Sequence, residues 1–499
     1  MTAWKKYVFA AATAITLVIA RYGFPPGSVS TDFRDAPREI PALDSLNGLN
    51  PAGNGPAVPA PATPVKGGLN PAEFARRIYG DPGSDSQASD KWYGADSDRA
   101  RMKFSSFMLY ELPAGYTGSN ADINLMVETV RFQLRHMFGA FTTHPYFKNN
   151  PGIPSGDYKI TWLGVDKIPG TTRLKIRYSY ENIVVFAKPL FNGGGPQQIS
   201  FVLPKDPVRI YGKSYSKSLK KNPCTDKHYN NEGDFWYFWN PYQKGCSVSD
   251  EDLVTIQAEL QPIASTRETY PEYRRLRGDN GKVLEVTYLI GVNEKISDGD
   301  AGKKNFDDAF IGLQKAGFQV TVDEPFHKKF SRRNSGYRAV IDMYLVDFHA
   351  DKFNFLQVAV HGLETSDVFL YNGHSGLGGN LSLQWLAWGK GNKPLALPTG
   401  KYQIFYFHGC STYAYYNESF FKLKRTPEDP KGTKQLDIIT TGVESMFKGG
   451  AGVDIAFLTS IATDQRPSWQ AIINKMHAAE GASSALTHVN GDEDNPPTP

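Results

Sequence analysis

The hydrophobic residues of this chain follow one period in its first half and another in its second half. In TTRLKIRYSY, which begins at Thr171, apolar residues alternate with polar ones, as in an antiparallel strand with one exposed face. The segments ENIVVFAKPLF and QQISFVLPKDPVRIYG continue this theme between glycines and prolines. An amphipathic helix is predicted in ADINLMVETVRFQLRHMF, whose apolar residues recur at helical spacing. Residues 71–275 are therefore predicted to form a strand-rich α+β domain.

Beyond residue 280, apolar runs alternate with amphipathic segments. Strands are predicted in KVLEVTYLIG, QVTV, YRAVIDMYLV, SDVFLYNGH, YQIFYFHGC and LDIITTG. Helices are predicted in NFDDAFIGLQK, with Asn305 as its N-cap, from Asp351 to about Leu363, and in ESMFKGGAGVDIAFLTSIA and SWQAIINKMHAA. This alternation predicts an α/β fold, in which helices cover both faces of a mostly parallel sheet.

Two of these predicted strands end in residues that can carry chemistry. FLYNGHSGLGG places His374 in a cluster of glycines, and 36 residues later QIFYFHGC ends in Cys410. In an open parallel sheet, catalytic groups gather beyond the carboxyl ends of the strands. If these two strands are neighbours, imidazole and thiol converge as a base and a nucleophile, the pair that acyl transfer needs.

These motifs resemble the signatures of the caspase-like cysteine peptidases, the group of caspases, metacaspases, legumains and gingipains. In that family an apolar strand ends in Tyr-x-Gly-His, and a later one ends in the nucleophilic cysteine; FLYNGH and QIFYFHGC are similar, in the same order. The resemblance covers roughly residues 280–480 and implies a caspase-like domain over 276–480. It also implies that Cys410 is the nucleophile and that His374 is the general base and acid.

The resemblance implies oxyanion donors as well, namely backbone N–H groups of the cysteine and of a glycine after the histidine. Here Ser375 follows His374 and Gly376 comes one place later, so both are candidates for the second donor. Two residues before the cysteine, metacaspases and legumains have an acidic residue, whereas this chain has His408. A preference for basic residues at the cleavage site is therefore not supported.

Each of these residues also has a plainer interpretation. A cysteine that closes an apolar strand is often a small buried hydrophobe, and glycines around a histidine also fit a turn. Alternation along the strand places His408 on the same face as Cys410, where structural burial is expected for it. A zinc shell of His374, His408 and Cys410 is a further alternative, although no CxxC or HExxH pair supports it.

The first residues predict export. Two lysines precede the apolar stretch Tyr7–Ala20, whose 14 residues suit a signal peptide better than a membrane span, which needs about 20. Val18 and Ala20 suit the −3 and −1 positions of a cleavage site, so residues 1–20 are predicted to be a signal peptide and the protein to be periplasmic, cell-envelope or extracellular. An uncleaved membrane anchor is the alternative. Residues 21–70 read as a Pro/Gly/Ala-rich linker.

Export gives the three cysteines different roles. Cys224 and Cys246 lie close together in an aromatic-rich, loop-like segment, so they are predicted to form a disulfide. Cys410 is left as a free thiol. The aromatic cluster FWYFWNP beside this pair is interpreted as a packed corner of the core rather than an exposed platform.

The composition permits globular domains and limits the partners. The 499 residues are 40% apolar and 13% aromatic, which suffices for two or three domains with cores. The net charge is +4, and short basic clusters such as KSYSKSLKK and HKKFSRR are interpreted as solvated surfaces, so no nucleic-acid partner is expected. Residues 481–499, which end in GDEDNPPTP, are expected to be a disordered tail.

Together these features predict an exported cysteine endopeptidase that hydrolyses protein or peptide substrates through Cys410 and His374. A thiolate attack on a peptide carbonyl needs no cofactor. The alternative is a non-catalytic binding or structural protein of the cell envelope, built on the same caspase-like scaffold.

Overall fold

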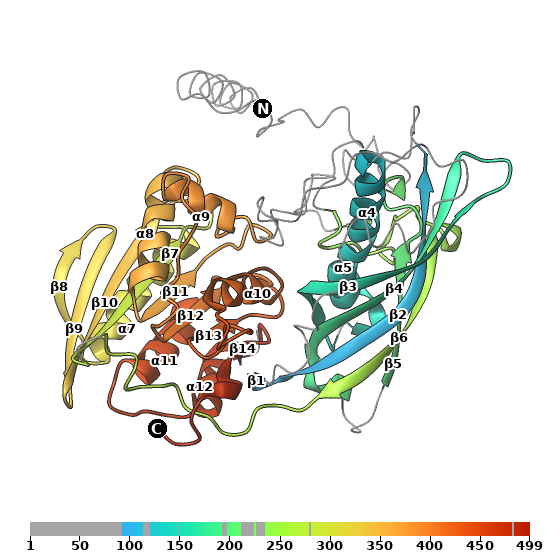
Figure 1. The fold of residues 1–499 in the computed structure, drawn as a ribbon. Helices are drawn as coiled ribbons and strands as arrows, with labels where there is room; N and C mark the ends of the chain where they lie inside the picture. The colour runs from blue at the N-terminus through green and yellow to red at the C-terminus, as the bar shows by residue number, and fades with distance from the viewer. Residues whose placement is uncertain are drawn as a thin grey trace, which may run out of the picture. The chain divides into compact units, whose positions relative to one another are not determined.

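The computed structural model describes residues 92–112, 120–147, 149–191, 197–210, 224–225, 235–278, 281–481 and 484–499. The expected signal peptide and linker, at 1–20 and 21–70, lie outside this part of the chain. The described residues form two β-sheets, one of five strands and one of nine (Figure 1).

The five-stranded sheet is antiparallel throughout, in the order β3-β4-β2-β6-β5. One face packs against α4 and α5 in a hydrophobic core, whereas the other carries polar residues such as Lys103, Glu181 and Glu259. β4 contains the alternating stretch that the sequence predicts. The elements of this part are β2 (Ser97–Glu111), α4 (Asn120–Arg135), α5 (Met137–Thr143), η2 (Pro145–Phe147), β3 (Gly152–Lys167), β4 (Arg173–Ala187), η3 (Lys188–Phe191), β5 (Gln197–Pro204), η4 (Asp250–Asp252) and β6 (Leu253–Ile263).

The nine-stranded sheet has the order β1-β14-β13-β12-β11-β7-β10-β9-β8. Its five central strands, from β13 to β10, are parallel, and the edge strands are antiparallel. Three of the parallel strands are buried over their whole length, which explains their continuous apolar runs and confirms the α/β class. The strands are β1 (Trp92–Gly94), β7 (Val283–Gly291), β8 (Gln319–Glu324), β9 (His327–Asn334), β10 (Tyr337–Val346), β11 (Val368–Asn372), β12 (Gln403–His408), β13 (Leu436–Thr440) and β14 (His488–Asn490).

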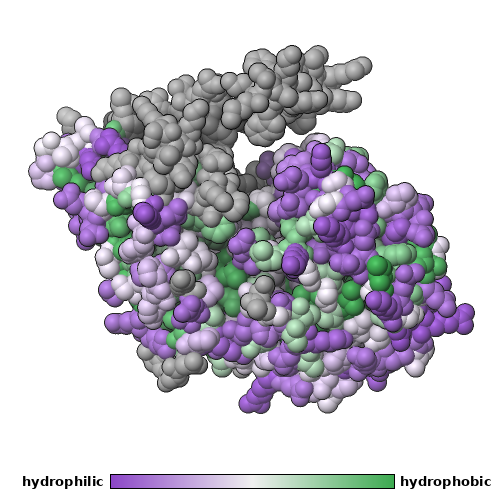
Figure 2. All heavy atoms as spheres, turned by 180° about the vertical axis from the view of Figure 1, so that it is seen from behind, coloured by the Kyte–Doolittle hydropathy of each residue, from purple (hydrophilic) through white to green (hydrophobic). Residues whose placement is uncertain are grey.

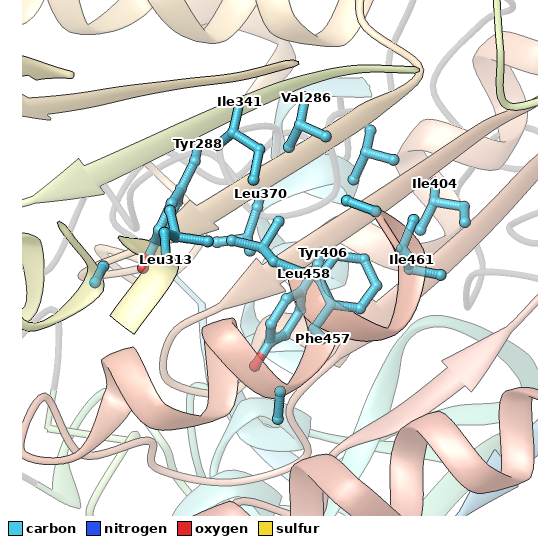
Figure 3. Close-up of a cluster of buried hydrophobic side chains, with 14 of the residues drawn as sticks. Val286, Tyr288, Leu313, Ile341, Leu370, Ile404, Tyr406, Phe457, Leu458 and Ile461 are labelled. Atoms are coloured by element: carbon cyan, nitrogen blue, oxygen red, sulfur yellow. The ribbon is translucent and has the colours of Figure 1, made fainter. Parts of the chain in front are cut away.

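Helices cover both faces of this larger sheet. Helices α7, α11 and α12 share a core on one face, and α8, α9 and α10 share a core on the other. Figure 3 shows part of the first core, where Tyr288, Leu370 and Tyr406 of three strands lie near Phe457 and Leu458 of α11. The helices are α7 (Ala301–Lys315), α8 (Lys352–Thr365), α9 (Leu383–Gly389), α10 (Thr412–Lys424), α11 (Gly450–Ile461), α12 (Trp469–Glu480) and η5 (Asp492–Asp494).

Both ends of the described chain belong to the larger sheet, which differs from the domain limits expected from the sequence. β1 pairs with β14, although the sequence places it within the α+β domain. β14 pairs in turn with β13, and the buried carboxylate of Asp492 accepts hydrogen bonds from Thr266 and Thr269. The segment 481–499, expected to be a disordered tail, is therefore part of the fold from residue 484, because its polar groups find buried partners.

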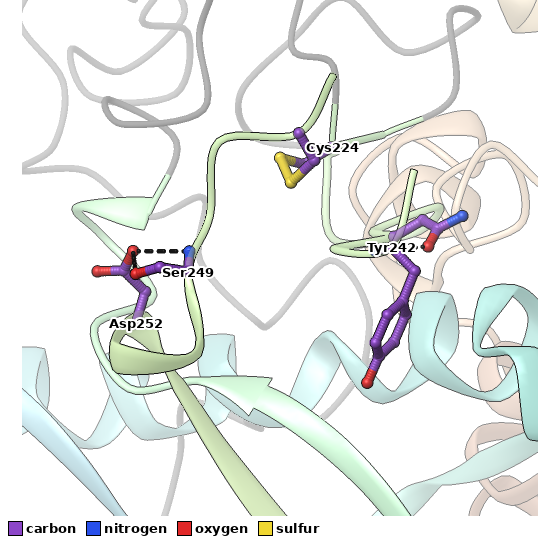
Figure 4. Close-up of a disulfide and its surroundings, with 6 residues drawn as sticks. Cys224, Tyr242, Ser249 and Asp252 are labelled. Carbon is purple, nitrogen blue, oxygen red and sulfur yellow. Dashed lines mark hydrogen bonds between the residues drawn. A yellow bond between two sulfur atoms is a disulfide. The ribbon is translucent and has the colours of Figure 1, made fainter. Parts of the chain in front are cut away.

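A disulfide joins Cys224 and Cys246, as the sequence predicts, with their Cα atoms 4.6 Å apart (Figure 4). Near it, Ser249 and Asp252 form a capping box at η4. The aromatic residues Phe235, Trp236, Tyr237 and Trp239 are buried, in agreement with their interpretation as a packed corner. Cys410 is the remaining, unpaired cysteine.

Hydrophilic side chains predominate on the face of the molecule in Figure 2, with hydrophobic ones in small groups between them. The large hydrophobic side chains that are exposed come from separate segments: Tyr146, Leu163, Tyr242, Ile311, Phe326, Phe353, Trp385 and Met446. Single exposed side chains of this kind are ordinary for a folded protein, whereas Phe353 and Trp385 both contact Trp388 and form a small group. Among the described residues, no helix has the length and apolarity needed to cross a membrane.

Candidate functional site

The candidate site lies beyond the carboxyl ends of β11 and β12, which are parallel neighbours. Asn372, the last residue of β11, pairs in register with His408, the last residue of β12. His374 and Cys410 each follow two residues later. The structure therefore brings both residues to the same edge of the sheet, the edge where ligands bind in folds of this kind.

Gly409 allows the two strand ends to approach closely. A Cβ added at this position would lie 2.4 Å from the carbonyl oxygen of Gly373 and 3.5 Å from the amide nitrogen of Ser375. The N–H of Gly373 also donates to the carbonyl of His408 at 3.0 Å. Any side chain at position 409 would force the two loops apart.

Two backbone amides at this edge have no hydrogen-bond partner among the described residues, although Ser375 itself is buried. The N–H groups of Ser375 and Cys410 make no hydrogen bond to any described residue, whereas the Ser375 carbonyl accepts three, from the N–H groups of Gly378 and Asn380 and from the hydroxyl of Tyr416 at 2.9 Å. Gly376 has a φ of +58°, a backbone conformation that favours glycine. Of the two positions suggested by the sequence, Ser375 is the one whose amide lies beside Gly409.

The loop after β7 holds the imidazole ring of His374. Nε2 of His374 donates to the carbonyl oxygen of Asn293 at 3.0 Å, and the ring lies edge-on to Phe447 with 4.8 Å between centroids. In the neutral ring, a proton on Nε2 leaves Nδ1 as the nitrogen that can accept another. Asn293 therefore orients His374 as a base, and it does so through its backbone.

Asn293 is held in turn by Asp300, whose side chain is 7% exposed. The Asp300 carboxylate accepts hydrogen bonds from the N–H groups of Asn293, Glu294 and Lys303, each at 3.0 Å. Asp300 is also the N-cap of α7, which begins one residue later. The prediction of Asn305 as the N-cap is wrong, because Asp300 satisfies the first turn and Asn305 is buried inside the helix.

Desolvation keeps both candidate reactive groups neutral. His374 is an exposed residue by surface area, yet the atoms packed around its ring desolvate it and lower its pKa below the ordinary 6.5, and the bond to Asn293 opposes this only in part. Desolvation raises the pKa of the Cys410 thiol to about 11, and the charge of Glu444 acts in the same direction. At neutral pH the pair is therefore imidazole and thiol, rather than imidazolium and thiolate.

His408 is bound within the core, on the face of the sheet that α11 covers. Its Nδ1 lies 2.7 Å from the carboxylate of Asp454, and both side chains are buried. The Tyr288 hydroxyl donates to the same carboxylate at 2.5 Å, and the Asn372 amide donates to it as well. Burial alone would lower the pKa of His408, but the charge and hydrogen bond of Asp454 raise it above its ordinary value. His408 is thus a partner in a buried ion pair.

The structure does not form the zinc shell considered from the sequence. Among the described residues, no three His, Cys, Asp or Glu side chains are arranged to hold a metal ion. His374 bonds to Asn293, and His408 bonds to Asp454 instead of facing Cys410 as a ligand. Sequence reasoning identified the histidine and the cysteine of this edge, but it missed Asn293 and Asp300, which hold His374, and Asp454, which binds His408.

The fold and the site define an α/β protein with a histidine and a cysteine at the carboxyl edge of its parallel strands. Comparison of the chain with protein-family models, curated proteins and solved structures gives no match. A fold alone does not imply an activity, so the residues of this edge decide the function.

Proposed function

We propose that this protein is an exported cysteine endopeptidase whose caspase-like α/β domain hydrolyses peptide bonds with Cys410 and His374. One observation carries the proposal: adjacent parallel strands bring a thiol and an imidazole to the same edge, and Asn293 orients the imidazole. A nucleophile beside a base that a third group orients is the arrangement that acyl transfer needs. The disulfide between Cys224 and Cys246 supports export to an oxidising compartment.

Backbone strain near the site supports the proposal independently. Five non-glycine residues of the described chain have a positive φ, and two of them lie in the loops after β11 and β12. These two are Leu377, with a φ of +53°, and Ser411, with a φ of +55°. Residues held in this region cost stability and cluster at functional sites.

In the proposed reaction, the sulfur of Cys410 attacks the carbonyl carbon of the scissile bond while its proton passes to Nδ1 of His374. The tetrahedral oxyanion accepts hydrogen bonds from the N–H groups of Ser375 and Cys410. His374 then protonates the leaving amine as the C–N bond breaks, which leaves a thioester on Cys410. Water attacks the thioester, gives a proton to His374, and restores the thiol as the carboxylic acid leaves. This sequence balances without a cofactor.

The proposed partner is a protein or peptide substrate. No nucleic-acid partner is proposed, because basic residues do not form a dominant block in the sequence. A membrane contact is proposed only if the N-terminal apolar stretch stays attached as an anchor.

A non-catalytic binding or structural protein of the cell envelope is the second candidate function. The raised pKa of Cys410 favours it, because a thiol that stays protonated at neutral pH is a weak nucleophile. No hydrogen bond joins His374 to Cys410 in the described chain, which points in the same direction. Such bonds often form only in the complex with substrate, so a test of the reactivity of Cys410 decides between the two candidate functions.

Acetyl transfer from p-nitrophenyl acetate tests the chemistry without knowledge of the substrate. We expect acetylated Cys410 in peptide mass spectra after an acid quench, and hydrolysis of casein by the same protein. His374→Ala should slow the acetylation by about 100-fold, the contribution of a general base, and Cys410→Ala should abolish it. His361, which is exposed on α8, supplies the control, since His361→Ala should leave the rate unchanged.

The pH dependence of acetylation gives a second readout. Because the pKa of His374 is lowered, its ring stays neutral and able to accept a proton as the pH falls through 6.5. The rate should therefore hold at pH 6.5 and decline only at lower pH. Equal, slow acetylation in the wild-type protein and in His374→Ala would favour the non-catalytic candidate.

A further inference from the structure

We propose that Asp454 is a positioning residue for His374 and Cys410, a role that rests on the proposed function. Asp454 lies on α11, is fully buried, and contacts neither member of the pair. Its carboxylate instead binds Asn372 and His408, the residues two places before His374 and Cys410. One side chain thus connects the ends of both strands that carry the site.

We call Asp454 with its two partners, Asn372 and His408, the clamp. Its geometry follows from the register of the two strands. Asn372 and His408 are paired residues of parallel neighbours, so their side chains leave the sheet on the same face, the one that α11 covers. One carboxylate oxygen of Asp454 lies 2.7 Å from Nδ1 of His408, and the other accepts from Asn372 and from Tyr288 of β7. Figure 3 shows the same face, with Tyr288 near the apolar side chains of α11.

The connection from the clamp to the candidate pair is short and has the same form on both strands. Gly373 stands between Asn372 and His374, and Gly409 stands between His408 and Cys410. Glycine has no side chain that could anchor the backbone and has the widest conformational freedom. The directions of His374 and Cys410 therefore depend on how firmly Asn372 and His408 are held, in addition to the bonds within the loops, such as those that the His374 carbonyl accepts from Tyr371 and Asn380. Asp454 binds both Asn372 and His408.

A buried polar network can also serve stability alone, and the chain offers a matched control for that case. Asp437 of β13 is equally buried and binds three partners, Tyr402, Trp469 and Asn495. It is the second residue of its strand, at the end of the sheet opposite the candidate site. Loss of its carboxylate should reduce stability without affecting how His374 acts on Cys410.

A double-mutant cycle separates positioning from stability. The measured quantity is the acetylation rate of Cys410 with p-nitrophenyl acetate. The rate with His374 present, divided by the rate with His374→Ala, reports the coupling of the pair. In the Asp454→Asn background this ratio should fall by at least about tenfold, the size expected for interacting residues. In the Asp437→Asn background the ratio should equal that of the wild-type protein, while both single variants lower the melting temperature.

Asn372→Ala gives a milder version of the test, which covers the case that Asp454→Asn does not fold. It removes one arm of the clamp and leaves the ion pair of His408 and Asp454 in place, so the ratio should fall while the fold persists.

Each outcome has a distinct meaning. An unchanged ratio in Asp454→Asn, or in Asn372→Ala where the first variant does not fold, overturns the positioning role and leaves the proposed function standing. An equal loss in Asp437→Asn also overturns it, because the effect would then follow from stability. A ratio near one in the wild-type background overturns the proposed function itself, and the role of Asp454 with it.

Discussion

The two sheets of this protein distribute their polar side chains in opposite ways. Along the outer face of the five-stranded sheet, residues of opposite charge lie side by side on neighbouring strands, as Lys103 does with Glu181 and Glu259. In the nine-stranded sheet the central strands are apolar, and the candidate reactive residues His374 and Cys410 follow where strands end. A polar face lets water cover one side of a sheet, whereas polar groups that converge at one edge can bind a ligand and react with it.

The difference follows from how the strands are connected. An antiparallel strand leaves one face to water, so every second residue is free to be polar. Parallel strands are covered on both faces, so most polar positions near the sheet lie at the strand ends and in the connecting loops. The candidate site is thus a product of parallel connection, and we expect it to depend on the larger sheet alone.

The largest effect is expected from a matched pair of core substitutions, one in each sheet. Phe201 of β5 packs against Phe104 and Phe141, and Phe369 of β11 packs against Phe405. Phe201→Ala and Phe369→Ala should each lower the free energy of unfolding by about 3–5 kcal/mol, measured by urea denaturation. Only Phe369→Ala should slow acetylation of Cys410 in the folded protein. A slower reaction in Phe201→Ala would show that the site also depends on the five-stranded sheet.

The disulfide gives the next largest effect, and it belongs to the chain between β5 and β6. Cys224 and Cys246 are 22 residues apart, so their bond should stabilise the fold by about 3 kcal/mol through the constrained unfolded chain. Substituting both with serine should remove this amount and leave the acetylation rate unchanged. Peptide mapping without reductant checks the pairing. Free thiols at both positions, or a bond from either to Cys410, would contradict it.

The sequence predicts the difference between the two sheets wherever that difference depends on residues close together in the chain. Alternation in β4 and continuous apolar runs in β11 and β12 are visible in short windows, because side-chain period depends on strand type alone. The order of those runs places His374 and Cys410 at strand ends. β1 and β14 were missed, since each has three residues and pairs only with segments distant in sequence. The polar residues at 481–499 predict a tail because their partners, such as Thr266 and Thr269 for Asp492, are also distant in sequence.

The supporting residues of the site could not be predicted, for a different physical reason. Asn293 acts through its carbonyl group, which every residue possesses, so no side-chain type marks it. Asp454 lies in the apolar segment GAGVDIAFLTSI, where the helix is evident but the buried partners are not. His408 was expected to be buried, yet its role depends on Asp454, which is 46 residues away. Tertiary contacts of this kind have no local pattern.

Acid should destabilise both sheets through one buried histidine in each part. Burial lowers the pKa of His136, between α4 and α5, and of His488, in β14, to about 3. Both stay neutral in the fold, whereas the unfolded chain binds protons below pH 6.5, so stability is complete above 6.5 and falls towards pH 3. At pH 4.5 each should cost about 2–3 kcal/mol relative to pH 7.5 in urea denaturation.

Glutamine substitutions compare the two parts of the chain. His136→Gln and His488→Gln should each remove part of the loss between pH 7.5 and 4.5, because glutamine does not titrate there. Each can keep a donor for the backbone carbonyl that the histidine Nδ1 now contacts, at 2.8 Å for His136 and 2.7 Å for His488. Relief by only one of the two substitutions would mean that acid acts on a single sheet.

The smallest effect is expected from Tyr237→Phe, which removes a contact to the residue after Cys410. The Tyr237 hydroxyl lies 2.8 Å from the hydroxyl of Ser411, and both residues are buried. Loss of one such hydrogen bond should cost about 1 kcal/mol of stability. The acetylation rate should not change, because the N–H of Ser411 still donates to the carbonyl of Val443 at 3.1 Å and keeps the turn in place. A rate that falls with Tyr237→Phe would show that the aromatic segment beside the disulfide positions Cys410, and the site could no longer be assigned to the larger sheet alone.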